Sequence, residues 1–226
     1  MSEFSPEIVI PLLLWGTLVA LDLVSVPQAM ISRPVVAGTV AGALAGDMEA
    51  GFRVGVLFEL FALDVLPAGA VKYPDYGPAT VSAVALGAGT PWELGLGVSA
   101  ALGLVLAMLG GWSLQVVRRW NARAIQQRAA ALAAGESRAI RWLQYGGVLR
   151  DALRGFILTL AGLVLASTIS ESVRLDRPTA VAFTLVAIGS GLAAAAGAAF
   201  RGSGRGPRLK WLVAGIGVGI VLAVLA

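Results

Sequence analysis

The chain has 226 residues, of which 58% are hydrophobic and 13% are charged, and its formal net charge is +4. A soluble domain of this size cannot bury so much apolar surface, so the composition favours a protein that uses the lipid bilayer as its solvent. The sequence contains no Cys and no His, which excludes disulfides, thiolate or imidazole nucleophiles and phosphorylated His or Cys in this chain. We therefore expect no catalytic residue, no bound metal and no cofactor.

Five apolar stretches have, or approach, the length of a membrane-crossing helix: residues 6–24, 93–117, 155–170, 178–200 and 209–226. One crossing needs about 20 mostly apolar residues, and a backbone in lipid must satisfy its own hydrogen bonds. The stretches lack the alternating polar residues of a barrel strand. We predict an all-α, polytopic helical membrane protein with one integral membrane domain over residues 1–226. Acids rather than bases precede the first stretch, which we interpret as a retained span.

Basic residues are concentrated in the second half of the chain. Residues 1–110 contain three Lys and Arg against nine Asp and Glu, whereas residues 111–226 contain fourteen against four. The positive-inside rule places the Arg-rich connections 118–154 and 201–210 in the cytoplasm and the C-terminus outside. Membrane orientation explains these bases, so we expect no nucleic-acid partner. Within the first connection, Trp120 to Tyr145 predicts an interfacial helix on the membrane surface, with protein docking as the alternative.

The region 33–93 departs from the pattern of ordinary spans. Residues 34–46 are an apolar run of thirteen residues, which extends about 20 Å as a helix and is too short for an average bilayer. We predict a half-helix or one arm of a re-entrant hairpin, paired with the segment that follows. Gly38, Gly42 and Gly46 recur every four residues, a pattern that favours close packing of another helix.

Acidic residues interrupt the next apolar segment, residues 52–66. A carboxylate at membrane depth costs about 2.5 to 3.5 kcal/mol or more and is usually kept for a cavity, a partner or a ligand. Glu59 is therefore a candidate solute ligand, and Asp64 lies in the same segment. A structural ion pair of Glu59 with Arg53 or Lys72 is the alternative.

Residues 66–78 cannot form a continuous helix, because they contain three prolines and two glycines. Irregular backbone near membrane depth is tolerated where protein buries it or where it lines a watery cavity. Asp75 can accept hydrogen bonds from sugar hydroxyls, Lys72 can donate them, and Tyr73 or Tyr76 can lie against the C–H face of a pyranose. We predict that Glu59 and this loop form one solute site, with an ordinary extramembrane turn as the alternative.

These motifs resemble the membrane-spanning IIC subunit of the mannose/fructose/sorbose class of bacterial phosphotransferase system (PTS) sugar transporters. The matching residues, over about 30–90, are Arg33-Pro34, Leu44 to Met48 with Gly51, Phe58-Glu59-Leu60, Gly69-Ala70 and Pro74-Asp75. The order and spacing fit the family. The sequence departs from it at Asp64, Lys72 and Tyr73 among others, which leaves an acidic or amino sugar open as the substrate.

The resemblance implies a translocation subunit rather than an enzyme, located in the bacterial inner membrane, that moves a hexose or related sugar. It also implies an oligomer with a IID membrane subunit, served by cytoplasmic IIA and IIB proteins that phosphorylate the sugar, and site roles for Glu59, Asp75 and Gly69. Two alternatives stay open. One is an ion-coupled solute transporter without phosphorylation, in which Glu59 or Asp64 titrates. The other is a membrane assembly factor without transport, whose acidic residues pair with a partner subunit.

Overall fold

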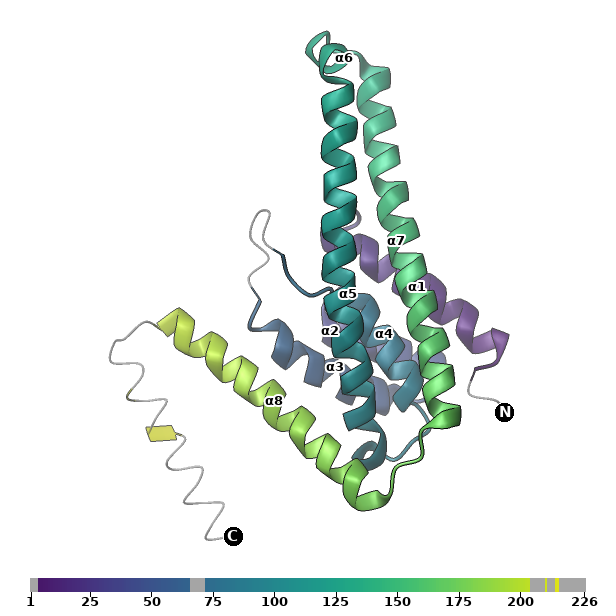
Figure 1. Cartoon of the computed structure of the whole chain (residues 1–226), viewed down its shortest axis with the longest axis vertical. Coiled ribbons are helices and arrows are strands. Elements are labelled where there is room, and N and C mark those ends of the chain that lie inside the picture. Colours follow the sequence, from purple (N-terminus) through teal and green to yellow (C-terminus); the bar gives the residue numbers. More distant parts are fainter. Residues whose placement is uncertain (1–3, 66–71, 204–209, 211–213, 216–226) are drawn as a thin grey trace.

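The computed structural model describes residues 4–65, 72–203, 210 and 214–215. Every element in these ranges is helical: α1 Pro6–Val24, α2 Pro34–Ala45, α3 Met48–Ala62, α4 Tyr76–Gly87, α5 Trp92–Gln127, α6 Ala129–Ala133, α7 Ser137–Ser172 and α8 Arg177–Ser203 (Figure 1). The all-α prediction is confirmed.

Four helices among the described residues have the length and hydropathy needed to cross a membrane: Pro6–Val24, Leu94–Gln127, Ser137–Ser172 and Arg177–Arg201. They contain the first four stretches predicted as spans, except that Glu93, the first residue of the stretch 93–117, lies just before Leu94. The fifth predicted span, residues 209–226, lies almost entirely outside the described residues. The protein is therefore a multi-pass membrane protein, as its composition requires.

The short helices α2 and α3 form an antiparallel hairpin. α2 has only 12 residues and ends at Gly46, whose φ of 83° lies in the left-handed region that glycine tolerates. Asp47 then begins α3, because its side chain accepts a hydrogen bond from the backbone N–H of Ala50 at 2.9 Å. The two outer ends of the hairpin, at Pro34 and Ala62, line the same cavity. The predicted pairing is thus present, and its re-entry into the membrane stays a prediction.

Glycine lets the two arms of this hairpin touch backbone to backbone. A Cβ atom added at Gly42 would lie 2.5 Å from the carbonyl oxygen of Asp47 and 2.7 Å from the Cα of Gly51. One added at Gly38 would lie 2.6 Å from the carbonyl oxygen of Gly51. Close packing therefore explains Gly38 and Gly42. It does not explain Gly46, where an added Cβ would meet nothing within 4 Å, and whose function is to turn the chain.

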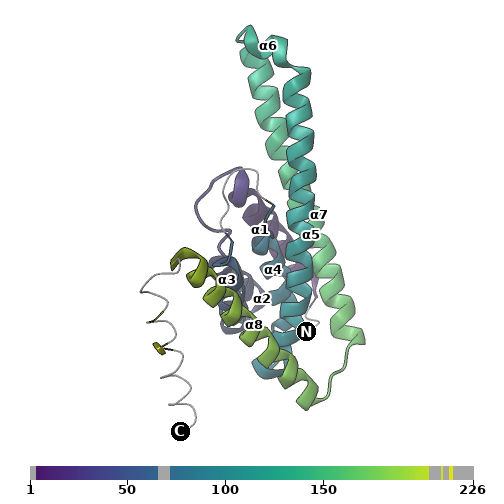
Figure 2. The same ribbon diagram turned by 60° about the vertical axis from the view of Figure 1, so that its left-hand side comes forward.

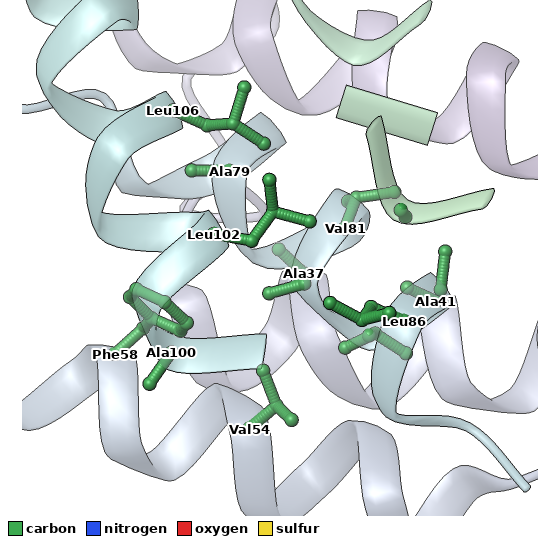
Figure 3. Close-up of a cluster of buried hydrophobic side chains, with 14 of the residues drawn as sticks. Ala37, Ala41, Val54, Phe58, Ala79, Val81, Leu86, Ala100, Leu102 and Leu106 are labelled. Atoms are coloured by element: carbon green, nitrogen blue, oxygen red, sulfur yellow. The ribbon is translucent and has the colours of Figure 1, made fainter. Parts of the chain in front are cut away.

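The apolar core lies between this hairpin, α4 and the first half of α5, and α1 and α7 also contribute to it. Phe58 and Val54 of α3 face Leu102 of α5 and Leu86 of α4 within one buried cluster (Figure 3). Residues 77–87 of α4 are all buried. At the far end of the hairpin the Asp47 carboxylate also accepts a hydrogen bond from the N–H of Gly89 at 3.2 Å, so the α2–α3 turn and the α4–α5 turn are joined.

The long helices α5 and α7 lie side by side and extend well beyond the other helices, with α6 at their shared end (Figures 1 and 2). We call the extended parts, residues 118–127 and 137–150, the arms. The predicted single helix from Trp120 to Tyr145 is wrong. The helix breaks at Arg128, and Gly135, at φ 72°, reverses the chain. The first part of the segment continues α5 and the last part begins α7, and both extend beyond the other helices.

Candidate functional site

A cavity of about 270 Å³ lies where the end of α1, the start of α2, the end of α3 and residues 73–77 meet. Its volume lies near the lower end of the range for small-molecule pockets, so it suits one small ligand. Its polar lining residues are Asp22, Gln28, Ser32, Arg33, Tyr73 and Tyr76. Apolar side chains of the same helix ends complete the wall, so the site offers both hydrogen bonds and apolar contact.

The carboxylate of Asp22 shapes the first wall of the cavity. Asp22 belongs to the last turns of α1 and is buried. Its Oδ1 accepts a hydrogen bond from the N–H of Ala29 at 2.5 Å, and its Oδ2 accepts one from the N–H of Ser32 at 2.9 Å. These two bonds fold the α1–α2 connection back over the helix end. They position Gln28 and Ser32 at the cavity.

Glu59 forms an ion pair with Arg33, the residue directly before α2. Its second oxygen accepts a hydrogen bond from the N–H of Val35 at 3.3 Å. Arg33 lines the cavity, whereas Glu59 lies directly behind it. The sequence pointed to Arg53 or Lys72 as ion-pair partners, and both were wrong: Arg53 pairs with Glu49 within α3. Glu59 therefore borders the cavity through its contact with Arg33.

Tyr73 joins the cavity to the outer part of α5. Its ring is buried, its hydroxyl accepts a hydrogen bond from Arg118 Nη2 at 2.9 Å, and the Arg118 guanidinium lies 5.3 Å from the ring centroid. The latter distance is typical of a cation–π contact. Gly110 and Gly111 of α5 allow this approach, because a Cβ at either position would collide with the backbone or side chains of residues 73–75.

Asp75 is completely buried and belongs to an ion cluster next to the cavity. Its Oδ2 lies 2.6 Å from Arg154 Nη1, and Arg154 Nε lies 2.9 Å from Asp151 Oδ1, both on α7. Ser25 donates its hydroxyl hydrogen to Asp151 at 2.7 Å. The N–H of Asp75 also donates to the carbonyl of Ala107 at 2.9 Å. Asp75 thus fixes the broken segment against α5 and α7, with Pro74 and Tyr76 presented to the cavity.

The remaining predicted ligands lie elsewhere. Asp64 pairs with Arg201 at the end of α8. Lys72 is exposed and is not among the described residues that line the cavity. Gly69 lies outside the described residues. Of the predicted residues, the structure brings Glu59, Tyr73, Asp75 and Tyr76 together around one cavity, with Tyr73 and Tyr76 in its wall.

Sequence reasoning missed Asp22 and the cationic partners Arg118 and Arg154. A signal existed for Asp22, because it is the one carboxylate beyond the first turn of the apolar run 6–24 and intramembrane carboxylates are costly. Asp151 and Arg154 lie just before the apolar run 155–170, where flanking charges are normally explained by the orientation of the span in the membrane. Nothing in the sequence indicates that they face Asp75, which is 79 positions from Arg154.

A helix hairpin, a broken helix and a polar cavity at their junction lie within a bundle of membrane-length helices, which makes this a polytopic membrane protein. The chain belongs to the family of PTS sorbose-specific IIC components, EII-Sor, whose family model matches residues 8–201.

Curated relatives carry related names. The chain is 28% identical over 141 residues to the PTS mannose-specific EIIC component of Escherichia coli K12, covering 62% of this chain and 51% of the relative. It is 30% identical over 138 residues to the sorbose-specific EIIC component of Klebsiella pneumoniae, covering 61% and 50%. The chain therefore spans about half the length of these relatives.

Two solved structures share the fold. One, described as a membrane protein, has a TM-score of 0.73 at 21% identity and covers 98% of this chain and 95% of its own. The other is a cryo-EM structure of the mannose transporter ManYZ with microcin E492, with a TM-score of 0.54 at 22% identity, covering 97% and 92%.

Proposed function

We propose that this chain is the sugar-translocating IIC subunit of a PTS transporter in the bacterial inner membrane. We also propose that the smaller cavity, which Arg33 and Tyr73 line, binds the sugar. The observation that carries the proposal is a polar cavity built from helix ends and broken backbone inside a bundle of membrane-crossing helices. Such places are where transporters bind their solutes. Family membership and the mannose and sorbose names of the relatives support a hexose as the substrate.

The lining residues suit the alternating hydroxyl and C–H surfaces of a hexose. Gln28 and Ser32 can both donate and accept hydrogen bonds, and Arg33 donates. Glu59, paired with Arg33, accepts hydroxyl hydrogen bonds when that pair opens toward the sugar. Tyr76 offers a ring already packed against Phe58, at 6.1 Å between centroids, so its orientation is set before the sugar arrives.

The transporter also needs partners, because this chain has no His or Cys to carry a phosphoryl group. We propose a IID subunit as the membrane partner within an oligomer, and cytoplasmic IIA and IIB proteins as phosphocarriers. The similarity in fold to the mannose transporter ManYZ supports this context. Translocation is then this chain's contribution, and phosphoryl transfer belongs to its partners.

Hexose binding to the chain assembled with its IID partner in nanodiscs tests the site. Ser32→Ala and Gln28→Ala each remove a hydrogen-bonding group from the wall, so each should weaken binding by about 0.5 to 1.5 kcal/mol. Gln126→Ala, an exposed residue near the tip of α5, is the matched control and should bind like the unaltered complex. If the assembled complex bound no hexose, the proposal would be refuted.

A second measurement separates phosphorylation-coupled from ion-coupled transport. Cells that lack every soluble PTS protein should lose hexose uptake through this complex. Uptake that persists there and collapses with the proton gradient would instead support an ion-coupled transporter.

A further inference from the structure

A second and larger cavity, of about 870 Å³, lies at the base of the arms. Three elements enclose it: the end of α1 with residues 25–28, the outer part of α5 and the first part of α7. It is separate from the sugar cavity, but Leu23 and Gln28 line both. The two cavities are therefore neighbours that share part of their walls.

Guanidinium groups enter this cavity from two facing helices. Arg118 comes from α5 and Arg150 from α7. Arg150 Nη1 donates a hydrogen bond to Asn121 Oδ1 at 2.8 Å, which fixes its position while using one of its five N–H donors. Gly147 also lines the wall and adds no side chain between the helices. Both Arg residues are partly buried, so their charge is less screened than that of an exposed Arg.

The one carboxylate among the described lining residues is Asp151. Its two oxygens already accept hydrogen bonds from Ser25 and Arg154, and its side chain is buried. The other polar lining residues, which include Gln28, Asn121 and Gln144, are neutral. The open part of the cavity therefore presents cationic and neutral groups, an arrangement suited to an anion with several acceptor oxygens.

We propose that this cavity binds a phosphate group through Arg118 and Arg150, and that a phosphorylated sugar brings it there. The assignment of the sugar rests on the proposed function. Arg recognises phosphate oxygens through pairs of parallel N–H bonds, and two Arg residues on facing helices can hold opposite sides of one phosphate. The volume accommodates a sugar together with its phosphate, and the arms' charge places this cavity on the cytoplasmic side, where phosphocarriers act.

The two cavities differ in charge, so the smaller one favours the uncharged sugar and the larger one favours the phosphorylated sugar. The smaller cavity has Asp22 and Arg33 in its wall, and Glu59 pairs with Arg33 directly behind it, so two carboxylates accompany one guanidinium there. A phosphate dianion is repelled there and attracted to the guanidinium groups of the larger cavity. Once phosphorylated, a sugar is therefore held on the far side of the Leu23 and Gln28 wall, which opposes its return.

An anionic lipid head group presents the same phosphate chemistry, so the experiment has one arm for each source. Calorimetry would titrate mannose 6-phosphate, mannose and inorganic phosphate into the assembled complex in nanodiscs of phosphatidylcholine. The titrations would be repeated in nanodiscs that contain phosphatidylglycerol. We expect mannose 6-phosphate to bind in phosphatidylcholine. No binding of mannose 6-phosphate in phosphatidylcholine, where no anionic lipid competes, would overturn the sugar phosphate as the source and leave the lipid phosphate as the occupant.

Two variants test the cavity itself. Arg150→Gln removes one guanidinium, and Gln144→Glu adds a carboxylate at an exposed lining position with little effect on packing. Each should weaken binding of mannose 6-phosphate at least tenfold, the effect of losing or opposing one charge-assisted hydrogen bond. Arg119→Gln is the matched control, because Arg119 is exposed and donates to Gln115 of its own helix. It should change affinity less than twofold.

Mannose affinity distinguishes this proposal from the proposed function. It should be the same in Arg150→Gln, Gln144→Glu and the unaltered complex, because mannose occupies the smaller cavity. If the complex binds no mannose, the proposed sugar site is wrong. If these variants still lose mannose 6-phosphate binding in that case, the phosphate site is supported on its own. Unchanged mannose 6-phosphate affinity in both variants, or an equal loss in Arg119→Gln, would overturn the phosphate site.

Discussion

The buried cluster of Asp75, Arg154 and Asp151 holds the broken segment in place. Two carboxylates share one guanidinium, with side-chain exposures of 0%, 4% and 2% for Asp75, Arg154 and Asp151. Replacing Arg154 with Gln strands both carboxylates away from water, so we expect a loss of about 3 to 5 kcal/mol in the free energy of unfolding. Thermal unfolding of the purified protein in detergent measures the change.

Arg174→Gln serves as the control for this prediction. Arg174 lies just beyond the end of the same helix and is exposed, where it donates to the carbonyl of Ser170. Its replacement should leave the unfolding temperature close to that of the unaltered protein. Equal stability of both variants would show that the cluster is not structural.

Glu59 and Asp75 should respond differently to loss of charge, although the sequence presented them as a pair of ligands. Glu59 is partly exposed next to the cavity, so Glu59→Gln should weaken hexose binding by about 1.5 to 3 kcal/mol with little loss of stability. Asp75→Asn breaks a fully buried ion pair and should cost stability of about 3 to 5 kcal/mol. Affinity and unfolding measured on both variants decide the roles. Unchanged affinity in Glu59→Gln would remove it from the site.

At the scale of elements, residue counts predicted most of what the structure shows. The shortness of α2 follows from the thirteen apolar residues of 34–46, and its pairing with α3 follows from Gly38 and Gly42. The loop around Asp75 follows from its prolines, although α4 already begins at Tyr76 and includes Pro78 in its first turn, where proline is tolerated. These features depend on local length and backbone chemistry, which a sequence shows directly.

The arms and the ion-pair partners could not be predicted in the same way. The composition of residues 118–154 indicates helix but carries no information on the direction of the helix axis. That direction depends on the turn at Gly135 and on the packing of α5 along α7. Likewise, Glu59 and Arg33 are 26 positions apart, and only the folded hairpin brings them together. Long-range pairing of charges is a property of topology rather than of local pattern.

The α2–α3 hairpin yields a prediction at this scale. Gly42→Ala places a Cβ 2.5 Å from the Asp47 carbonyl oxygen, so the two backbones must separate, at a cost of about 1 to 3 kcal/mol in stability. Gly189→Ala is the matched control, because an added Cβ there meets nothing within 4 Å and α8 gains a better helix former. Thermal unfolding should fall for the first variant and not for the second. Equal unfolding temperatures would mean that the hairpin packs loosely.

At the scale of the whole molecule, the distribution of Arg predicts orientation in the membrane. The arms and residues 201–210 should face the cytoplasm, and the C-terminus should face outward. A single cysteine at Ser137, at the exposed start of α7, should react with a membrane-impermeant maleimide only in inside-out vesicles. A reporter that is active only in the cytoplasm should be silent when fused after Ala226. Strong activity there would reverse the assignment of the C-terminus.

Helix length gives the arms a mechanical property. α5 has 36 residues and is about 54 Å long, against roughly 30 Å for the hydrocarbon core, so much of it stands in water. Where the arm of this helix begins, Arg118 contacts Tyr73, and on the adjoining helix Arg154 contacts Asp75. The paired helices therefore form a lever whose outer end projects beyond the other helices and which is tied to the cavity wall where the arms begin. A sideways force at the tip, applied by any docked protein, becomes a torque on Tyr73 and Asp75.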